Sequence, residues 1–254
     1  MHPYRTRFKK EIVAEFFPPL VHNKLKEERV IIFCSGEPGA PGKGKVLEFW
    51  AKKGFWAFNF RYRGTWESGG RFLRKSPEQD VLDIIDGLSR GFTEAFGHKK
   101  FRISRNAKIF LFGMSFGGPA AILASRDPRV AKIVTFSPVV NWRHHVKHGE
   151  TNAWTERFTR EAFGEAYRFS HKDWKKLDTG RFYNPMNHIE ELDGRKIMII
   201  HAKDDEVVPA IPVKKFAKLT GSRLLLLARG GHVSSDWFTK PKFYRKIVRF
   251  LKEK

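Results

Sequence analysis

The sequence is poor in cysteine and glutamine and has no long run of apolar residues. Its single cysteine, Cys34, has no partner for an intrachain disulfide, which favours a reducing compartment. No apolar run approaches the roughly 20 residues of a transmembrane helix, and the N-terminal stretch lacks the apolar segment of a secretory signal. We therefore expect a cytoplasmic protein without a membrane span. The single glutamine, Gln79, beside 30% charged residues points weakly to a heat-adapted source.

Acidic residues are also scarce relative to basic ones. The chain has 49 lysines and arginines against 27 aspartates and glutamates, which gives a formal net charge of +22. A charge of this size attracts anions and binds polyanions weakly, whatever the fold. The basic residues are spread from Arg5 to Lys254 instead of forming one run. They indicate non-specific polyanion binding and disfavour a dedicated nucleic-acid surface.

Short apolar runs alternate with helical patterns along most of the 254 residues. The runs expected to form central strands lie at residues 29–34, 55–60, 109–112, 130–136, 196–200 and 223–228. Residues 11–17 are expected to form an edge strand that ends at two prolines. This alternation predicts an α/β fold, with a mostly parallel sheet covered by helices on both faces. A chain of this length fits a single domain of that kind.

Residues 139–190 interrupt the alternation. They contain nine aromatic residues at helical spacings and no strand pattern. Because they stand between two strands, we expect them to lie over the edge where open α/β sheets bind ligands. The stretch is therefore predicted to be a small helical cap. Most of its aromatic side chains would pack the cap onto the core, and two or three would line a pocket.

The motif Gly-x-Ser-x-Gly occupies residues 113–117, between a strand pattern and a helix-prone run. In this context it is typical of a nucleophile elbow, a tight turn that holds a serine in strained backbone geometry. Gly113 and Gly117 leave room for such a turn. The turn would expose the Ser115 hydroxyl and direct the helix N-terminus at a developing oxyanion. The simpler alternative is a glycine-rich loop that only reverses the chain.

Two kinds of residue follow Ser115 in the order that a catalytic triad requires. The acidic pair Asp204 and Asp205 comes after one late strand, and His232 comes after the next. The carboxyl ends of parallel strands meet at one sheet edge, so these side chains can converge. A histidine can take the proton of a serine hydroxyl while a carboxylate fixes its tautomer. The order predicts a triad of Ser115, His232 and an aspartate.

These motifs resemble those of α/β-hydrolase-fold serine hydrolases, especially compact, feruloyl-esterase-like enzymes and the catalytic domains of prolyl-oligopeptidase-like peptidases. The resemblance covers the chain from about residue 29 and is weakest in the predicted cap. Relatives carry their acid in a His-Gly-x-x-Asp-x-x-Val-Pro pattern. Here the pattern begins at His201 with alanine in place of glycine, which makes Asp205 the acid and Asp204 the fallback. His232 matches the family's Gly-His near the C-terminus.

The oxyanion loop departs from the family pattern. Relatives have His-Gly after this strand, whereas this chain has Ser35-Gly36. An oxyanion donor of this kind is a backbone N–H group, so the loss of the histidine side chain leaves the site possible. The resemblance implies that the N–H groups of Glu37 and Phe116 form the oxyanion hole. A Glu37 carboxylate that points inward would disfavour an oxyanion there.

A second loop, residues 61–70, resembles the family's Arg-x-x-Gly-x-x-x-Ser-Gly segment beside the active site. Arg61 or Arg63 could bind a substrate carboxylate through two parallel hydrogen bonds. The alternative, which we favour, is that these arginines brace the loops from inside the protein. Trp66 and Trp142 are weaker candidates for contact with the substrate.

Together these features predict a serine hydrolase that cleaves small carboxylic esters, including aromatic or medium-chain acyl esters, without a metal or cofactor. One alternative is a peptidase for short peptides or acyl-amino acids. It would need a carboxylate for a free peptide N-terminus, for which Glu37, Glu67 and Glu150 are candidates. The alternative from another class is a non-catalytic, polyanion-binding protein. The sequence does not decide the oligomeric state.

Overall fold

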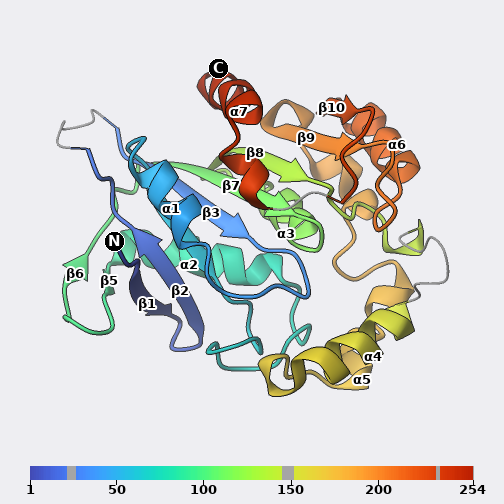
Figure 1. The fold of residues 1–254 in the computed structure, drawn as a ribbon. Helices are drawn as coiled ribbons and strands as arrows, with labels where there is room; N and C mark the ends of the chain where they lie inside the picture. Colours follow the sequence, from blue (N-terminus) through green and yellow to red (C-terminus); the bar gives the residue numbers. More distant parts are fainter. Residues whose placement is uncertain (22–26, 145–151, 233–234, 254) are drawn as a thin grey trace.

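The computed structural model describes residues 1–21, 27–144, 152–232 and 235–253, and its main feature is an eight-stranded sheet (Figure 1). The strand order is β1-β2-β4-β3-β7-β8-β9-β10. The strands are β1 (Tyr4–Phe8), β2 (Ile12–Phe17), β3 (Arg29–Cys34), β4 (Trp56–Phe60), β7 (Lys108–Met114), β8 (Val130–Phe136), β9 (Ile197–Ala202) and β10 (Arg223–Leu227). β2 pairs antiparallel with both neighbours, and all other pairs are parallel. The predicted α/β class and mostly parallel sheet are confirmed.

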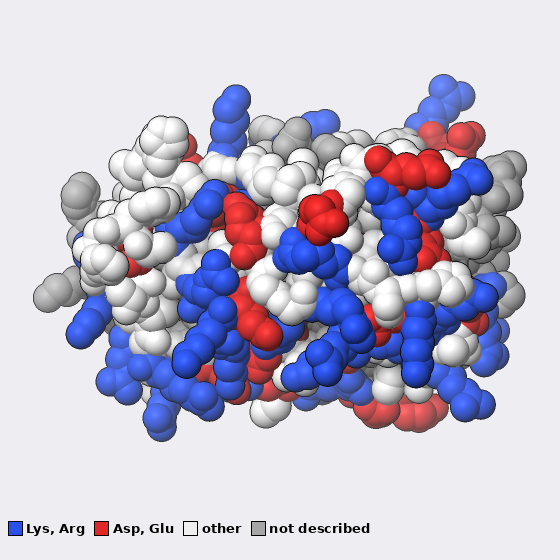
Figure 2. Space-filling model, turned by 90° about the horizontal axis from the view of Figure 1, so that it is seen from below, with Lys and Arg blue, Asp and Glu red and all other residues white. Residues whose placement is uncertain are grey.

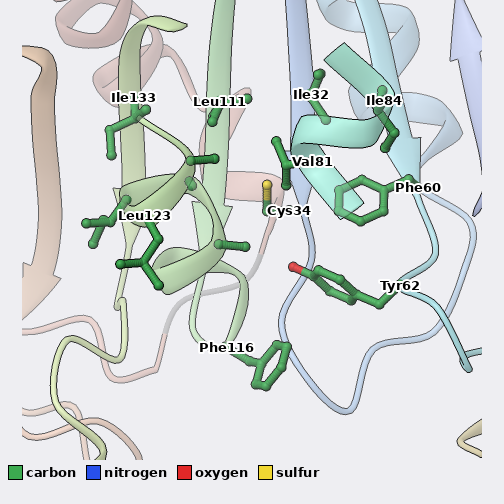
Figure 3. Packing of buried hydrophobic residues seen from close by; sticks show 14 of the residues in the cluster. Ile32, Cys34, Phe60, Tyr62, Val81, Ile84, Leu111, Phe116, Leu123 and Ile133 are labelled. Carbon is green, nitrogen blue, oxygen red and sulfur yellow. The ribbon is translucent and has the colours of Figure 1, made fainter. Parts of the chain in front are cut away.

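Helices cover both faces of the sheet. One face carries α1 (Gly44–Ala51) and α7 (Pro241–Lys252), and the other carries α2 (Glu78–Arg90), α3 (Gly117–Ala124) and α6 (Ala210–Thr220). Successive side chains of a strand point to opposite faces. In β3, Ile32 therefore packs toward α2 (Figure 3), while Ile31 and Phe33 pack toward α1. Because both faces are buried, the central strands are continuous apolar runs in the sequence.

The edge of the sheet differs from the prediction. Residues 11–17 were expected to form an edge strand, but β2 lies inside the sheet and all six of its residues are buried. The edge is β1, which pairs with β2 through a turn at Lys9 and Lys10. Both lysines have positive φ, at 48° and 61°. Turns of this kind usually contain Asn-Gly or Asp-Gly, so the sequence did not predict a hairpin at this lysine pair.

Helices fill the described part of the chain between β8 and β9. They are η1 (Trp142–His144), α4 (Asn152–Phe163), η2 (Gly164–Ala166), α5 (His171–Trp174), η3 (Leu177–Thr179), η4 (Pro185–Glu191) and η5 (Gly194–Lys196). Figure 1 shows α4 and α5 apart from the sheet, beyond the carboxyl end of β3. We call residues 139–190 the insertion. Its action as a cap stays a prediction.

The remaining elements are short. A separate hairpin joins β5 (Phe92–Thr93) to β6 (Lys100–Phe101), and a 3-10 turn, η6 (Ser235–Phe238), precedes α7. The turn η6 is separate from α7, which begins at Pro241 with the proline in its first turn. Among the described residues, no helix has the length and apolar character to cross a membrane.

Candidate active site

Ser115 lies at the sharp junction between β7 and α3. Its φ is +47°, in the left-handed region that residues with a side chain rarely adopt. The strained turn is fixed by the Ser115 N–H, which donates to the Phe136 carbonyl of β8 at 3.0 Å. Such strain persists only where surrounding contacts impose it and is common at functional sites. The geometry is that of a nucleophile elbow.

Two glycines make this turn possible. A Cβ added at Gly117 would lie 2.1 Å from the Cys34 carbonyl oxygen, and one at Gly113 would lie 2.6 Å from the Gly117 oxygen. Both distances are far inside van der Waals contact, so neither position has room for a side chain. The first and last glycines of the Gly-x-Ser-x-Gly motif therefore have a steric role here.

Asp205 and His232 come together at the ends of β9 and β10. His232 Nδ1 lies 3.1 Å and 3.0 Å from the two carboxylate oxygens of Asp205. Asp205 Oδ1 also accepts hydrogen bonds from the backbone N–H groups of Val207 and Val208. Burial alone would raise the pKa of Asp205, but the His232 contact and the backbone donor lower it overall. The carboxylate is therefore held in its ionised form beside the imidazole.

The two neighbouring aspartates have different surroundings. Asp205 is 1% exposed, whereas Asp204 lies at the surface and accepts a hydrogen bond from the Gly231 N–H. Asp205 is therefore the member of the pair that contacts His232. No hydrogen bond joins the Ser115 hydroxyl to His232 within the described parts of the chain, so that third contact stays a prediction. Catalytic hydrogen bonds are often long without substrate.

His201 supports the loop that carries Asp205. Its side chain is fully buried, and Nε2 donates to the Val208 carbonyl at 3.0 Å. Burial lowers the pKa of His201, so the ring stays neutral. Nε2 also lies 3.8 Å from Asp205 Oδ2. The first residue of the acid motif is therefore an internal support of the loop.

The predicted oxyanion donors lie on the two loops beside Ser115. Phe116 immediately precedes α3, and a Cβ added at Gly36 would lie 3.3 Å from Ser115 Cβ, so the loop with Glu37 passes close to the serine. Among the described residues, neither the Glu37 N–H nor the Phe116 N–H has a hydrogen-bond acceptor. Ser35, which replaces the family's histidine, donates its hydroxyl to Asn59 Oδ1. That bond anchors the loop to β4.

A cavity of about 110 Å³ adjoins Ser115. Its lining consists of Glu37, Pro38, Ser115, Phe116, Val139, Trp142, Trp154, Thr155, Phe158, Trp174, Leu177 and Val207. Four aromatic residues of this lining come from the insertion, whereas the sequence predicted that two or three would line a pocket. Trp154 and Phe158 stack with ring centroids 5.3 Å apart and are 39% and 40% exposed. They therefore present an aromatic surface at the mouth of the cavity.

Trp142, a predicted substrate contact, lines this cavity, but Trp66 does not. The indole of Trp66 instead donates to the Gly39 carbonyl at 2.8 Å, which ties the 61–70 loop to the loop after β3. Tyr167 of the insertion reaches the same point, because its hydroxyl accepts from the Gly39 N–H. These contacts connect the 61–70 loop to two segments that border the cavity, the loop after β3 and the insertion.

The two candidate arginines lie outside the cavity lining and contact carboxylates of the protein itself. Arg61 is 4% exposed and forms ion pairs with Glu15 and Glu67. Arg63 contacts three carboxylates, those of Glu11, Asp80 and Asp83. This placement favours the alternative in which both arginines brace the loops.

The three carboxylates considered for a peptide N-terminus also differ in position. Glu67 forms ion pairs with two arginines, Arg5 and Arg61, and Glu150 lies outside the described residues. Glu37 lines the cavity, where the Thr159 hydroxyl of α4 donates to its Oε1 at 2.8 Å. Burial raises the pKa of the Glu37 carboxyl from 4.5 to about 8, although the Thr159 bond partly opposes this. In the described part of the chain, no cluster of three metal-ligating side chains occurs.

The raised pKa of Glu37 makes stability depend on pH. Between about pH 4.5 and 8 the unfolded chain ionises this carboxyl while the folded protein keeps the proton, so the free energy of unfolding falls as pH rises. We expect Glu37→Gln to remove this loss. Urea unfolding at pH 5 and pH 8 measures the free energy of unfolding of both proteins. Relative to wild type, the variant should be more stable at pH 8 than at pH 5. Glu161→Gln, an exposed change on α4, is the control and should show no such gain.

Residues 43–254 match the sequence model of the prolyl oligopeptidase family. Among solved structures, an esterase from Pyrococcus furiosus superposes with a TM-score of 0.68 at 16% identity, covering 98% of this chain and 90% of that one. An acylaminoacyl peptidase from Pyrococcus horikoshii gives 0.65 at 18% identity, covering 99% of this chain but 42% of that one. Est1E from Butyrivibrio proteoclasticus gives 0.65 at 13% identity over the full length of both chains.

No curated protein matches the sequence. At these identities the structural likeness shows the fold, and the family follows from the sequence match over most of the chain. The chain belongs to the prolyl oligopeptidase family and is a serine hydrolase with an α/β-hydrolase fold.

Proposed function

We propose that the protein hydrolyses carboxylic esters with Ser115 as the nucleophile and His232 and Asp205 as its partners. His232 takes the serine proton as Ser115 attacks the acyl carbonyl, and Asp205 stabilises the imidazolium that forms. The imidazolium then protonates the leaving alcohol, which leaves an acyl-enzyme. Water activated by His232 attacks the acyl-enzyme and releases the acid and the serine.

The developing oxyanion would be held by the N–H groups of Glu37 and Phe116. Both belong to segments fixed by other contacts, so little reorganisation is needed at the moment of reaction. The N-terminus of α3 adds a partial positive charge on the same side. This part of the proposal rests on the position of both N–H groups beside Ser115 and on their lack of acceptors among the described residues.

The observation that carries the ester assignment is the cavity at Ser115. It is small, aromatic and bordered by the insertion, and it suits the acyl part of a compact ester better than an extended peptide. Trp154 and Phe158 at its mouth would contact an aromatic or medium-chain acyl group, such as a feruloyl group. One observation favours the peptidase alternative: the Glu37 carboxyl lies in this cavity and could meet a peptide N-terminus.

The basic surface remains the basis of the polyanion-binding alternative. Figure 2 shows lysine and arginine side chains over much of the face seen from below, with acidic side chains between them. Several lysines and arginines of the described chain form ion pairs, such as Arg71 and Lys176 with Asp173. Such intermixing favours weak, salt-sensitive binding over a specific nucleic-acid site.

A substrate panel tests the proposed function. We expect turnover of p-nitrophenyl esters from acetate to decanoate with an optimum at short or medium chains, because the cavity limits the acyl group. Aminoacyl p-nitroanilides should react more slowly. An anilide kcat/KM above the best ester value would favour the peptidase. If the protein hydrolyses neither substrate and binds RNA or DNA tightly with a steep salt dependence, the polyanion-binding alternative would replace both the esterase and the peptidase functions.

A further inference from the structure

Glu37 is the only ionisable side chain among the described lining residues of the cavity at Ser115. Among the described residues, the hydrogen-bond partner of its carboxyl is a neutral hydroxyl, that of Thr159. This is unusual in a chain with 49 lysines and arginines. Two buried carboxylates elsewhere have cationic partners: Glu15 pairs with Arg61, and Asp80 pairs with Arg63. Within the described residues, the Glu37 carboxyl thus lacks a countercharge.

The rest of the cavity wall is suited to a cation. Aromatic rings of Phe116, Trp142, Trp154, Phe158 and Trp174 surround the space next to the carboxyl. The faces of aromatic rings carry partial negative charge and attract ammonium groups, most strongly where water is excluded. Several rings and one carboxyl in one cavity form a site for an organic cation.

Other classes of acyl group fit this wall less well. An anionic group would find no cationic side chain among the described lining residues to pair with. A purely apolar group would displace water from the carboxyl without supplying a countercharge, which costs free energy. Burial without a countercharge also explains why the pKa of Glu37 is raised to about 8. A bound cation supplies the missing charge and favours the carboxylate.

We propose that the cavity selects ester substrates whose acyl group carries a protonated amine, as in amino acid esters, with Glu37 as the countercharge. This inference rests on the proposed role of Ser115 and narrows its substrate class. Glu37 and Ser115 line the same cavity of about 110 Å³, so the amine would lie within a few bonds of the attacked carbonyl. Glu37 then has two roles, its backbone N–H at the oxyanion and its side chain at the amine, whose positive charge offsets that of the carboxylate near the oxyanion.

A matched pair of substrates tests the proposal. The p-nitrophenyl esters of alanine and isobutyrate share a leaving group and differ by an ammonium in place of a methyl group. For each protein, kcat/KM is measured for both esters at a pH where the amine is protonated, and the alanine-to-isobutyrate ratio is taken. Comparing the ratio between proteins cancels the intrinsic reactivity of each ester.

We expect Glu37→Gln to lower this ratio at least tenfold, because glutamine keeps the size of the side chain and removes its charge. Glu161→Gln makes the same change on the exposed side of α4 and should keep the wild-type ratio. An unchanged ratio in Glu37→Gln overturns the cation proposal. Turnover of isobutyrate by wild type in that case leaves the proposed ester hydrolysis standing.

A binding measurement on the wild-type protein needs neither turnover nor a folded variant. Three tryptophans line the cavity, so their fluorescence should report its occupation. Butylammonium should bind at least tenfold more tightly than 1-butanol, and Glu37→Gln should abolish this preference. Equal affinities for the two probes overturn the proposal. If neither ester is hydrolysed, the proposed function fails, and this titration alone decides whether the cavity binds cations.

Discussion

Replacing Ser115 with alanine is expected to lower kcat for p-nitrophenyl butyrate by about 10⁶-fold, the scale of such a loss in other serine hydrolases. Alanine cannot attack the carbonyl, so no acyl-enzyme forms, and only binding and the oxyanion donors remain. The fall in kcat should be much larger than any rise in KM, because the residues that line the cavity are otherwise unchanged. Stopped assays with high enzyme concentration measure the residual rate.

The matched control for this change is Ser89→Ala, which removes a hydroxyl from α2, outside the candidate site. It should retain the wild-type rate. Thermal unfolding of both variants separates lost chemistry from lost structure. A Ser115→Ala rate within tenfold of wild type would contradict the role of Ser115.

Replacing Asp205 with asparagine is expected to lower kcat by about 10⁴-fold, as in other triads. Asp205 accepts a hydrogen bond from His232 Nδ1 and is 1% exposed. An asparagine amide donor facing Nδ1 favours the tautomer whose Nε2 carries the proton, and such a ring cannot take the proton of Ser115. The loss of the carboxylate also removes the charge that stabilises the imidazolium.

Asp204→Asn makes the identical change at the neighbouring residue, whose carboxylate faces solvent and Gly231. The rate should stay within about threefold of wild type, because surface substitutions of this kind have small effects. Steady-state kinetics on the two variants side by side give the comparison. Equal losses would show that the loop as a whole, and not the contact of Asp205 with His232, is required.

The central strands and the order of the site residues are the parts of this protein that local sequence predicts. A strand buried on both faces must be apolar at successive positions, and the loop at its carboxyl end must begin where that run stops. Ser115 follows such a run directly, and Asp205 and His232 lie on the loops after β9 and β10. Their shared location at one sheet edge therefore follows from the parallel topology.

Contacts between residues far apart in the sequence could not be predicted from local patterns. Arg61 reaches Glu15, and Arg63 reaches Asp80, through pairings that no local pattern reveals. The edge position of β1 depends on a turn of two lysines with positive φ, which is a weak signal. The sequence left the direction of the Glu37 carboxylate open, because its surroundings depend on Thr159 in an insertion that local patterns placed only roughly.

The insertion gives the site its chemical character. The fold alone supplies the elbow, the acid and the histidine, whereas Trp142, Trp154 and Trp174 come from residues 139–190. Active sites in this kind of fold lie at the carboxyl edge of the sheet, where loops vary freely without disturbing the core. Differences in substrate between proteins of one fold are therefore expected to arise in such segments.

Covalent trapping of the nucleophile tests the central claim most directly. The protein is incubated with a fluorophosphonate, which reacts with activated serines, and the modified residue is located by mass spectrometry of its peptides. Our account predicts one adduct, on Ser115, with loss of esterase activity in proportion to labelling and no labelling of Ser115→Ala. Full activity in unlabelled protein, or an adduct on another serine that accompanies inactivation, would contradict it.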